Sequence, residues 1–178
     1  MSKLLQISAG SVRDDNGGIY HLDISPKVNA ILNTYEEVGN RKLIVVSAYV
    51  ASVERLYEIM TKHGINCRFI HGGIGTEERK HSIMDFQNGP IQMLILQPQA
   101  MAHGITLTAS STIVWQSLVA SGETYNQMNG RITRAGQTKK QYVQHLIGSK
   151  ADEHVLNILK KKMDVATAIL GLLSNRDL

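Results

Sequence analysis

Hydrophobic residues along this chain fall into short runs that are separated by longer segments with helical spacing. The apolar runs occupy residues 43–46, 67–70, 91–96, 112–115 and 142–146. Most of them lack alternating polar positions, which is typical of parallel strands that are buried on both faces. The segments between them, at 50–63, 76–87 and 122–134, have helical patterns. This order predicts an α/β fold in three layers, with a parallel sheet covered by helices on both faces.

The N-terminal part of the chain has a different pattern. Residues 4–24 combine two extended runs with a turn at residues 14–18, which predicts a β-hairpin. Ser25 is followed by Pro26, an order typical of an N-cap and the first position of a helix. We therefore expect a hairpin over 1–24 and, after it, a helix that ends near Gly39.

The C-terminal part of the chain predicts one long helix. Apolar residues repeat at helical spacing between Ser149 and about Leu173, so the helix is expected to pack on the body of the protein. They are Val155, Ile158, Leu159, Ala166, Ile169 and Leu170. The main domain is therefore expected to span residues 25–178.

The composition is that of a single soluble domain. The chain has 178 residues, of which 43% are hydrophobic and 19% are charged, without long tracts of either kind. The net charge is +4 and the isoelectric point is about 9.2. A mildly basic protein is compatible with phosphate-bearing partners, although many such proteins have none.

Cysteine content and hydropathy bear on the expected location. Cys67 is the single cysteine, which excludes a disulfide framework and favours a reduced, intracellular setting. No apolar stretch is long enough for a membrane span, and the first residues do not resemble a signal peptide. We expect a protein of the cytoplasm, in the nucleoid or in a viral host cell, without a membrane partner.

The segment from Gln127 to Gln137 carries the most specific chemistry. It reads Gln-Met-Asn-Gly-Arg-Ile-Thr-Arg-Ala-Gly-Gln. Arg131 and Arg134 are three residues apart at the end of an expected helix, so both guanidinium groups should project from one side, which suits a polyphosphate. Gly130 lets a ligand or backbone approach closely. The alternative is that these cations only decorate a helix end, where they interact favourably with the helix dipole.

This segment resembles motif VI of superfamily two helicases in its Swi/Snf version, Gln-x-x-Gly-Arg-x-x-Arg-x-Gly-Gln. It matches that motif at every defined position. The resemblance implies a RecA-like C-terminal lobe in which Arg131 and Arg134 act as arginine fingers on ATP phosphates held by another lobe. It also places Gln127 and Gly130 in the ATP cleft.

Segments further upstream resemble other motifs of the same family, in the same order. Residues 43–49 resemble motif IV, and residues 69–87 resemble the strand, glycine turn and helix that follow it. Residues 94–108 resemble motif V, which in these motors contacts the nucleic-acid backbone and connects to the ATP cleft. Gly104 matches motif V and is assigned to the ATP cleft, whereas Met101 and Ala102 replace the small glycines of many members.

The resemblance also implies a nucleic-acid surface on the loops after the strands. Its expected members are Ser47, His71, Gly72 and Thr108, which would contact phosphates through backbone N–H groups and hydroxyls without reading base sequence. The Swi/Snf character of motif VI favours duplex DNA as the partner. For His71, a plain structural role is the stronger alternative.

Two nucleotide-binding features of complete motors do not occur in this sequence. There is no Gly-x-x-x-x-Gly-Lys-Ser/Thr loop, and no Asp-Glu pair follows an apolar strand. We therefore expect ATP and Mg²⁺ to be held mainly by an N-terminal RecA-like lobe in cis, with residues 1–24 leading in from that lobe. The chain alone is not expected to hydrolyse ATP. The seven histidines lack metal-ligand spacing, so no metal site is expected.

Two alternatives remain open beside the helicase lobe. One is a stand-alone nucleic-acid-binding or regulatory module with the same fold and no hydrolysis. The other, a small-molecule enzyme on a Rossmann-like sheet, has little support because no Gly-x-Gly-x-x-Gly follows the first strand.

Overall fold

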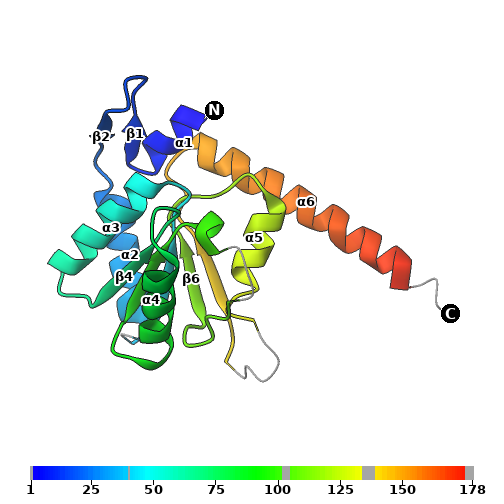
Figure 1. The fold of residues 1–178 in the computed structure, drawn as a ribbon. Helices are drawn as coiled ribbons and strands as arrows, with labels where there is room; N and C mark the ends of the chain where they lie inside the picture. Colours follow the sequence, from blue (N-terminus) through cyan, green and yellow to red (C-terminus); the bar gives the residue numbers. More distant parts are fainter. Residues whose placement is uncertain (1, 40, 102–104, 134–138, 175–178) are drawn as a thin grey trace.

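The structure is a computed structural model that describes residues 2–39, 41–101, 105–133 and 139–174. For Ser2 and for residues 166–174 it describes only the backbone. The ribbon shows one central sheet with helices in front of it and behind it, a small hairpin beside the N-terminus, and a C-terminal helix that leaves the body (Figure 1).

The central sheet has five parallel strands in the order β4-β5-β3-β6-β7. The strands are β3 (Leu43–Val46), β4 (Cys67–Ile70), β5 (Met93–Leu96), β6 (Thr112–Trp115) and β7 (Tyr142–His145). The apolar runs predicted these five strands, and the parallel sheet is confirmed. Because the chain first adds strands on one side of β3 and then on the other, the order reverses between β3 and β6.

Helices cover both faces of this sheet, which confirms the three-layer prediction. On one face lie α2 (Ser25–Glu37) and α3 (Val50–Lys62). On the other face lie α4 (Thr76–Asn88), α5 (Gly122–Asn129) and the first part of α6 (Lys150–Ser174). A short 3-10 helix, η1 (Pro98–Met101), follows β5. Among the described residues, no helix is both long and apolar enough to cross a membrane.

Alternate residues of the strands point into two hydrophobic cores, one on each face of the sheet. Ile44, Val46 and Trp115 pack with α4, α5 and α6, whereas residues such as Val45 face α2 and α3. Each fully buried aliphatic side chain contributes roughly 1.5–3 kcal/mol to stability. Cys67 is buried in the second core, and burial raises the pKa of its thiol to about 12.

The N-terminal segment is only partly a hairpin. Residues Ser2–Ser8 form a helix, α1, so the prediction of an extended run from residue 4 is wrong. The hairpin is confined to β1 (Ser11–Arg13) and β2 (Ile19–His21). A short run such as this one is ambiguous between helix and strand, and here the helix lets Leu5 reach the core.

The expected turn of the hairpin is present. The Asp14 carboxylate accepts hydrogen bonds from the backbone N–H groups of Asn16 and Gly18, and Gly17 has a left-handed φ of 90°. Asp14 therefore closes the turn in the way that Asx turns do.

The start of α2 differs from the prediction by one residue. The N-cap position is Ile24, without a side-chain capping bond, and Ser25 already lies inside the helix. The hydroxyl and N–H of Ser25 instead donate to Asp23, and these bonds lower the pKa of that carboxyl group. The polar contact at this helix start is thus made by Asp23.

The long C-terminal helix forms as expected, but it packs on the body only through its first turns. Val155 and Leu159 are buried, whereas residues 160–165 are exposed. Beyond them the helix projects away from the sheet (Figure 1). The prediction that the whole helix packs on the body is therefore wrong.

A buried ion pair joins α2 to α6. Lys27 Nζ lies 3.3 Å from Asp152 Oδ2, and the two residues are 8% and 1% exposed. The same carboxylate oxygen accepts hydrogen bonds from the Ser8 hydroxyl and the Gly148 N–H, while Lys27 Nζ also donates to the Gln116 carbonyl. Burial lowers the pKa of Lys27, and the Asp152 carboxylate partly opposes this effect.

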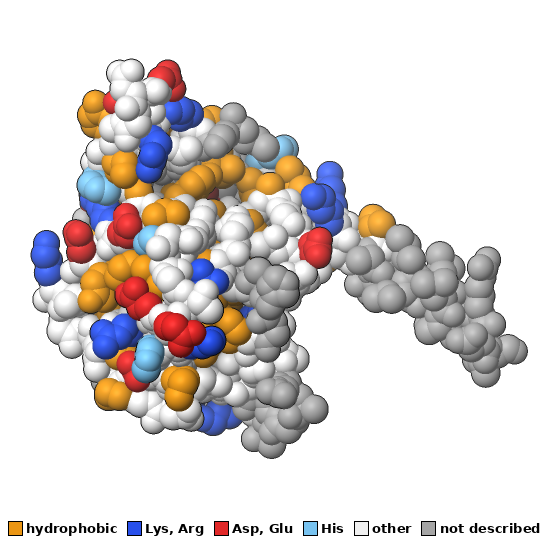
Figure 2. Space-filling view, viewed as in Figure 1, with side chains coloured by type: hydrophobic (Ala, Val, Ile, Leu, Met, Phe, Trp, Pro, Cys, Tyr) orange, Lys and Arg blue, Asp and Glu red, His pale blue; other side chains and the backbone are white. Residues whose placement is uncertain are grey.

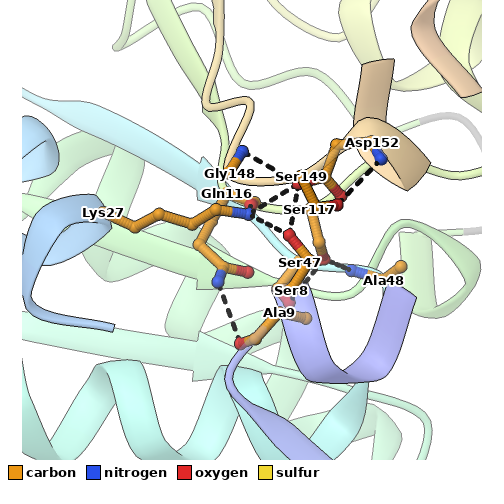
Figure 3. A network of polar contacts seen from close by, with 10 residues as sticks. All are labelled: Ser8, Ala9, Lys27, Ser47, Ala48, Gln116, Ser117, Gly148, Ser149 and Asp152. Atoms are coloured by element: carbon orange, nitrogen blue, oxygen red, sulfur yellow. Dashed lines mark hydrogen bonds and ion pairs between the residues drawn. The ribbon is translucent and has the colours of Figure 1, made fainter. Parts of the chain in front are cut away.

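The polar network around this pair connects residues that lie far apart in the sequence (Figure 3). Gln116 lies just after β6, and its side-chain amide donates to the Ala9 carbonyl behind α1. Ser8 and Ala9 of the N-terminal segment are thus bonded to the start of α6 and to the residue that follows β6. The division of the chain at residue 24 stays a prediction.

We expect Asp152→Ala to lower the free energy of unfolding by about 3–5 kcal/mol, because it leaves the buried Lys27 ammonium without a counter-charge. Urea denaturation measures this loss. Asp164→Ala, at an exposed position of the same helix, is the matched control. The double variant Lys27→Met/Asp152→Leu should be more stable than Asp152→Ala alone. A double variant that loses the sum of the stabilities lost in the two single variants would contradict this account.

Candidate functional site

Polar residues follow four neighbouring strands at the carboxyl edge of the sheet, where doubly wound folds place their ligands. They are Ser47 after β3, His71 and Gly72 after β4, Gln97 after β5, and Ser117 after β6. Three of the four residues expected on the nucleic-acid surface therefore lie at this one edge.

Ser47 is held inside this edge. Its side chain is buried, and its hydroxyl lies 3.0 Å from the hydroxyl of Ser117. The Ser117 hydroxyl also accepts the backbone N–H of Ala48 at 2.9 Å. The Ser47 hydroxyl thus orders the loop after β3 and faces the protein.

Gln97 connects the loops that follow β3 and β4. Its side-chain oxygen accepts the N–H of Gly72 at 3.2 Å, and its side-chain nitrogen donates to the carbonyl of Ala48 at 3.3 Å. Its own backbone N–H donates to Ile70. One amide group therefore sets the spacing of the two loops that carry the expected phosphate contacts.

His71 is engaged within the protein at both ring nitrogens. Nε2 lies 3.2 Å from a carboxylate oxygen of Glu54 on α3, and Nδ1 accepts the N–H of Gly73 at 3.0 Å. The ring is buried and stacks on Phe69 with the ring centroids 5.5 Å apart. These contacts favour the structural alternative for His71, as the residue that shapes the glycine turn.

Arg131 binds the last residue of η1 and the segment that follows it. Its guanidinium donates from Nη2 to the carbonyl of Met101 at 2.9 Å and from Nη1 to the carbonyl of Ile105 at 3.1 Å. Its backbone carbonyl accepts the N–H of Leu107. Its Nε is buried and has no partner among the described residues. Arg131 thus fastens the motif V segment to the motif VI segment.

The helix that leads to Arg131 is shorter than expected. The prediction of a helix over 122–134 is wrong, because α5 ends at Asn129 and Arg131 lies in the turn behind it. From Arg131 to Thr133, each N–H donates to the carbonyl three residues back instead of four, which tightens the chain out of the α-helix. Arg131 thus lies beyond the helix on which it was expected, and the expectation that it shares one side with Arg134 stays a prediction. Arg134 lies outside the described residues.

Of the other residues expected in the ATP cleft, the structure describes Gln127 and Gly130. Gln127 is exposed on α5, where its amide donates to Glu123. Gly130 is exposed with an ordinary helical φ of −62°, and a Cβ there would lie 3.3 Å from the carbonyl of Asn126. Gly104 lies outside the described residues.

Thr108 lies at the opposite edge of the sheet from Ser47 and Gly72. The next residue, Ala109, donates its N–H to the side chain of Gln87 near the end of α4. The Ser110 hydroxyl donates to the carbonyl of Lys42, directly before β3. The chain therefore crosses from the carboxyl edge of the sheet to its amino edge before Ala109. The structure does not bring Thr108 together with the other three residues.

Two contacts position α5 against the sheet. The Tyr125 hydroxyl lies 2.8 Å from Nε2 of His145 on β7, and the indole N–H of Trp115 donates to Asn129 at 3.0 Å. Burial, and to a smaller extent the charge of Lys160, lowers the pKa of His145. The start of the motif VI segment is thus anchored to β6 and β7.

Charge on the visible face is mixed. Figure 2 shows acidic and basic side chains interspersed over α4. Within α4, Glu77 and Lys80 form an ion pair. Within the part of the chain that the structure describes, no three His, Cys, Asp or Glu side chains gather as a metal site.

Gln97 and Ser117 are the site residues that sequence reasoning missed. Their positions directly after buried strands were a usable signal, since residues that follow neighbouring strands meet at one edge. Nothing in the sequence pattern indicated that the carbonyls of Met101 and Ile105 would receive Arg131.

A five-stranded parallel sheet with helices on both faces is the fold of a RecA-like lobe, and the family comparison assigns this lobe to the helicase class. The chain belongs to the family described as the helicase conserved C-terminal domain, which matches residues 26–136. Its relatives identify it more narrowly as similar to the C-terminal lobe of Swi/Snf-type ATPases.

Two curated relatives and one solved structure represent this likeness. The chain is 28% identical to the chromatin-remodeling ATPase INO80 of Homo sapiens over 90% of its own length. It is 28% identical, over 72% of its length, to the SWI/SNF-related matrix-associated actin-dependent regulator of chromatin subfamily A-like protein 1 of Drosophila melanogaster. The crystal structure of the C-terminal part of the Fun30 ATPase domain superposes with a TM-score of 0.68 at 19% identity, over 75% of this chain and 44% of that one.

The chain spans only a small part of the curated relatives. It covers 10% of INO80 and 17% of the Drosophila protein. The likeness therefore concerns one lobe, and the activities of the whole proteins enter below as proposals.

We expect Gln97→Leu to speed hydrogen exchange of the Gly72 amide by about tenfold, because the substitution removes the acceptor of that N–H. Amide exchange followed by NMR measures the effect. Gln99→Leu, at an exposed position two residues further on, should leave the Gly72 rate unchanged. Equal rates in the wild type and in Gln97→Leu would show that the bridge does not order this loop.

The lowered pKa of His145 predicts a loss of stability in mild acid. The imidazole stays neutral in the fold at pH values where the unfolded chain, with an ordinary pKa near 6.5, is already protonated. The unfolded state then binds more protons, so stability is full above about pH 6.5 and falls below it, by at most about 1.4 kcal/mol per pH unit.

Urea denaturation between pH 7.5 and pH 5 measures this dependence. His145→Gln should flatten the slope, whereas His81→Gln, at an exposed position on α4, should not. An unchanged slope in His145→Gln would assign the acid sensitivity to other groups.

Proposed function

We propose that this chain is the C-terminal lobe of an ATP-dependent DNA translocase of the Swi/Snf type. In this role it supplies arginine fingers to an ATP site and part of a surface for the backbone of duplex DNA. ATP and Mg²⁺ are held mainly by the phosphate loop and acidic pair of an N-terminal lobe in cis. The chain alone does not hydrolyse ATP.

The observation that carries this proposal is the contact of Arg131 with the segment after η1. The guanidinium binds the carbonyls of Met101 and Ile105, which joins the motif expected at ATP to the motif expected at nucleic acid. A motor needs such a connection, because phosphate chemistry at one site must change contacts at the other.

In the proposed cycle, the two arginines of motif VI have different tasks. Arg134 is the finger that reaches the phosphates. Arg131 exchanges its carbonyl partners for phosphate oxygens when the lobes close, which is favourable because a charged acceptor binds a guanidinium more strongly than a neutral one does. Release of Met101 and Ile105 then loosens the motif V segment.

The proposed DNA contacts lie at the carboxyl edge. The loops after β3 and β4 are joined there by Gln97. In this proposal the N–H groups of Ala48 and Gly72, which donate to Ser117 and Gln97, exchange these partners for phosphate oxygens. Backbone donors position phosphates without reading bases, so binding is expected to be sequence-independent and sensitive to salt. In this proposal Ser47 and His71 shape the loops, and Thr108 acts from the far end of motif V.

Steady-state ATP hydrolysis tests the proposal, with and without duplex DNA, for this chain alone and for it joined to a lobe that carries the phosphate loop. We expect DNA-stimulated hydrolysis only in the joined form. Arg134→Ala should lower kcat by roughly a thousandfold or more, and Arg68→Ala, an exposed arginine on β4, is the control.

Arg131→Lys separates the two tasks. It retains the positive charge but cannot bind two carbonyls at once, so we expect basal hydrolysis to fall less than stimulation by DNA. A kcat that is unchanged in Arg134→Ala would overturn the proposal. DNA binding without any hydrolysis in the joined form would instead support the stand-alone binding module.

A further inference from the structure

A groove runs along the open edge of the sheet, on the far side from β4. Its volume is about 650 Å³. One wall is the end of α2 with Arg41, and the other is the edge strand β7 with the residues that lead into it. We name it the β7 groove, and its principal lining residues are Val38, Arg41, Lys139, Lys140, Tyr142 and Val143.

The outer edge of β7 carries unpaired backbone groups. On its inner edge, Tyr142 donates its N–H to Ser111 and Leu146 donates to Trp115, at 2.9 Å each. Because alternate residues of a strand face its partner, Val143 and His145 direct their N–H and C=O groups outward. No residue in the described part of the chain pairs with these groups. Tyr142 and Val143 are 54% and 37% exposed.

Cations surround this edge. Arg41, Lys139 and Lys140 line the groove, and among the described residues that line it Glu37 is the one acidic residue. Lys140 Nζ lies 5.5 Å from the ring centroid of Tyr142. A smaller groove of about 270 Å³ shares Arg41 and Lys139 with it, and none of the described residues that line this smaller groove is acidic.

Lysines can also protect an edge strand from pairing. Protective lysines project from the strand itself, however, and β7 contains none. Here the lysines precede the strand, so they add charge beside the edge while the edge stays open to a partner.

We propose that the β7 groove binds an extended acidic peptide segment, which pairs with the outer edge of β7 as an added strand. Backbone hydrogen bonds to Val143 and His145 provide affinity, and the cations select Asp and Glu side chains. A nucleic-acid strand fits less well, because a phosphodiester backbone has no N–H donors for the outward carbonyls of β7.

Fluorescence anisotropy with the 178-residue chain tests this proposal. The probe is a labelled peptide of about ten residues that alternates Glu with Val, a length suited to one strand. One control peptide carries Lys in place of Glu. A second keeps the Glu residues but has alternate amides N-methylated, which removes the donors of one edge. We expect saturable binding of the first peptide only.

Variants of the groove separate charge from backbone pairing. Lys140→Glu should weaken binding by about tenfold, whereas Lys140→Arg should retain it. Lys62→Glu, at an exposed position at the end of α3, is the charge-reversal control. Val143→Pro removes an outward N–H from the edge and leaves the inward bonds to β6, so it should abolish binding.

Three outcomes would overturn the proposal. Equal binding of the N-methylated peptide would reduce the effect to charge alone. Absence of binding by the Glu–Val peptide at millimolar concentration would show that the β7 groove does not bind an extended acidic peptide. Binding of an oligothymidine that depends on Lys140, without peptide binding, would assign the groove to nucleic acid. None of these readouts depends on ATP hydrolysis, so the translocase proposal succeeds or fails separately.

Discussion

The buried pair of Lys27 and Asp152 is the contact on which the arrangement of this lobe depends. Neither charge could stay in the interior alone, because the desolvation of an isolated ion costs several kcal/mol. The pair therefore forces α2, α6 and the loop at Gly148 to meet at one point, and Ser8 brings the N-terminal segment to the same point. Two segments at opposite ends of the chain are thereby specified relative to the central sheet, which hydrophobic packing alone would define less sharply.

Two planar side chains organise the site above that framework. The amide of Gln97 spans the loops after β3 and β4, and the guanidinium of Arg131 spans two carbonyls behind η1. Each presents several hydrogen-bonding groups in a rigid plane, so each couples two backbone segments. A displacement of either side chain would displace both backbone segments that it binds. The site is therefore a set of loops with shared anchors, in which contacts cannot change independently.

The strands could be predicted from the sequence because β3, β5 and β6 are buried on both faces, and continuous apolar runs report that burial directly. The predicted ends of α3 and α4 are right to within one residue. The end of α5 could not be predicted, since tertiary contacts decide it: α5 stops where Arg131 turns toward Met101 and Ile105. The motif letters identified Arg131 and Thr108 but carried no information on which edge of the sheet each would occupy. The helix α1 was not predicted because its seven residues are too few to distinguish a helical from an extended apolar pattern.

The projecting part of α6 has a geometric consequence. A helix rises about 1.5 Å per residue, so Ser174 stands about 22 Å from Leu159, the last buried residue of the helix among the side chains that the structure describes. Over that length the helix is a rigid spacer. Whatever contacts its outer turns is held at a set distance and direction from the sheet, and a rotation of the lobe by a few degrees becomes a displacement of ångströms at the tip of this arm.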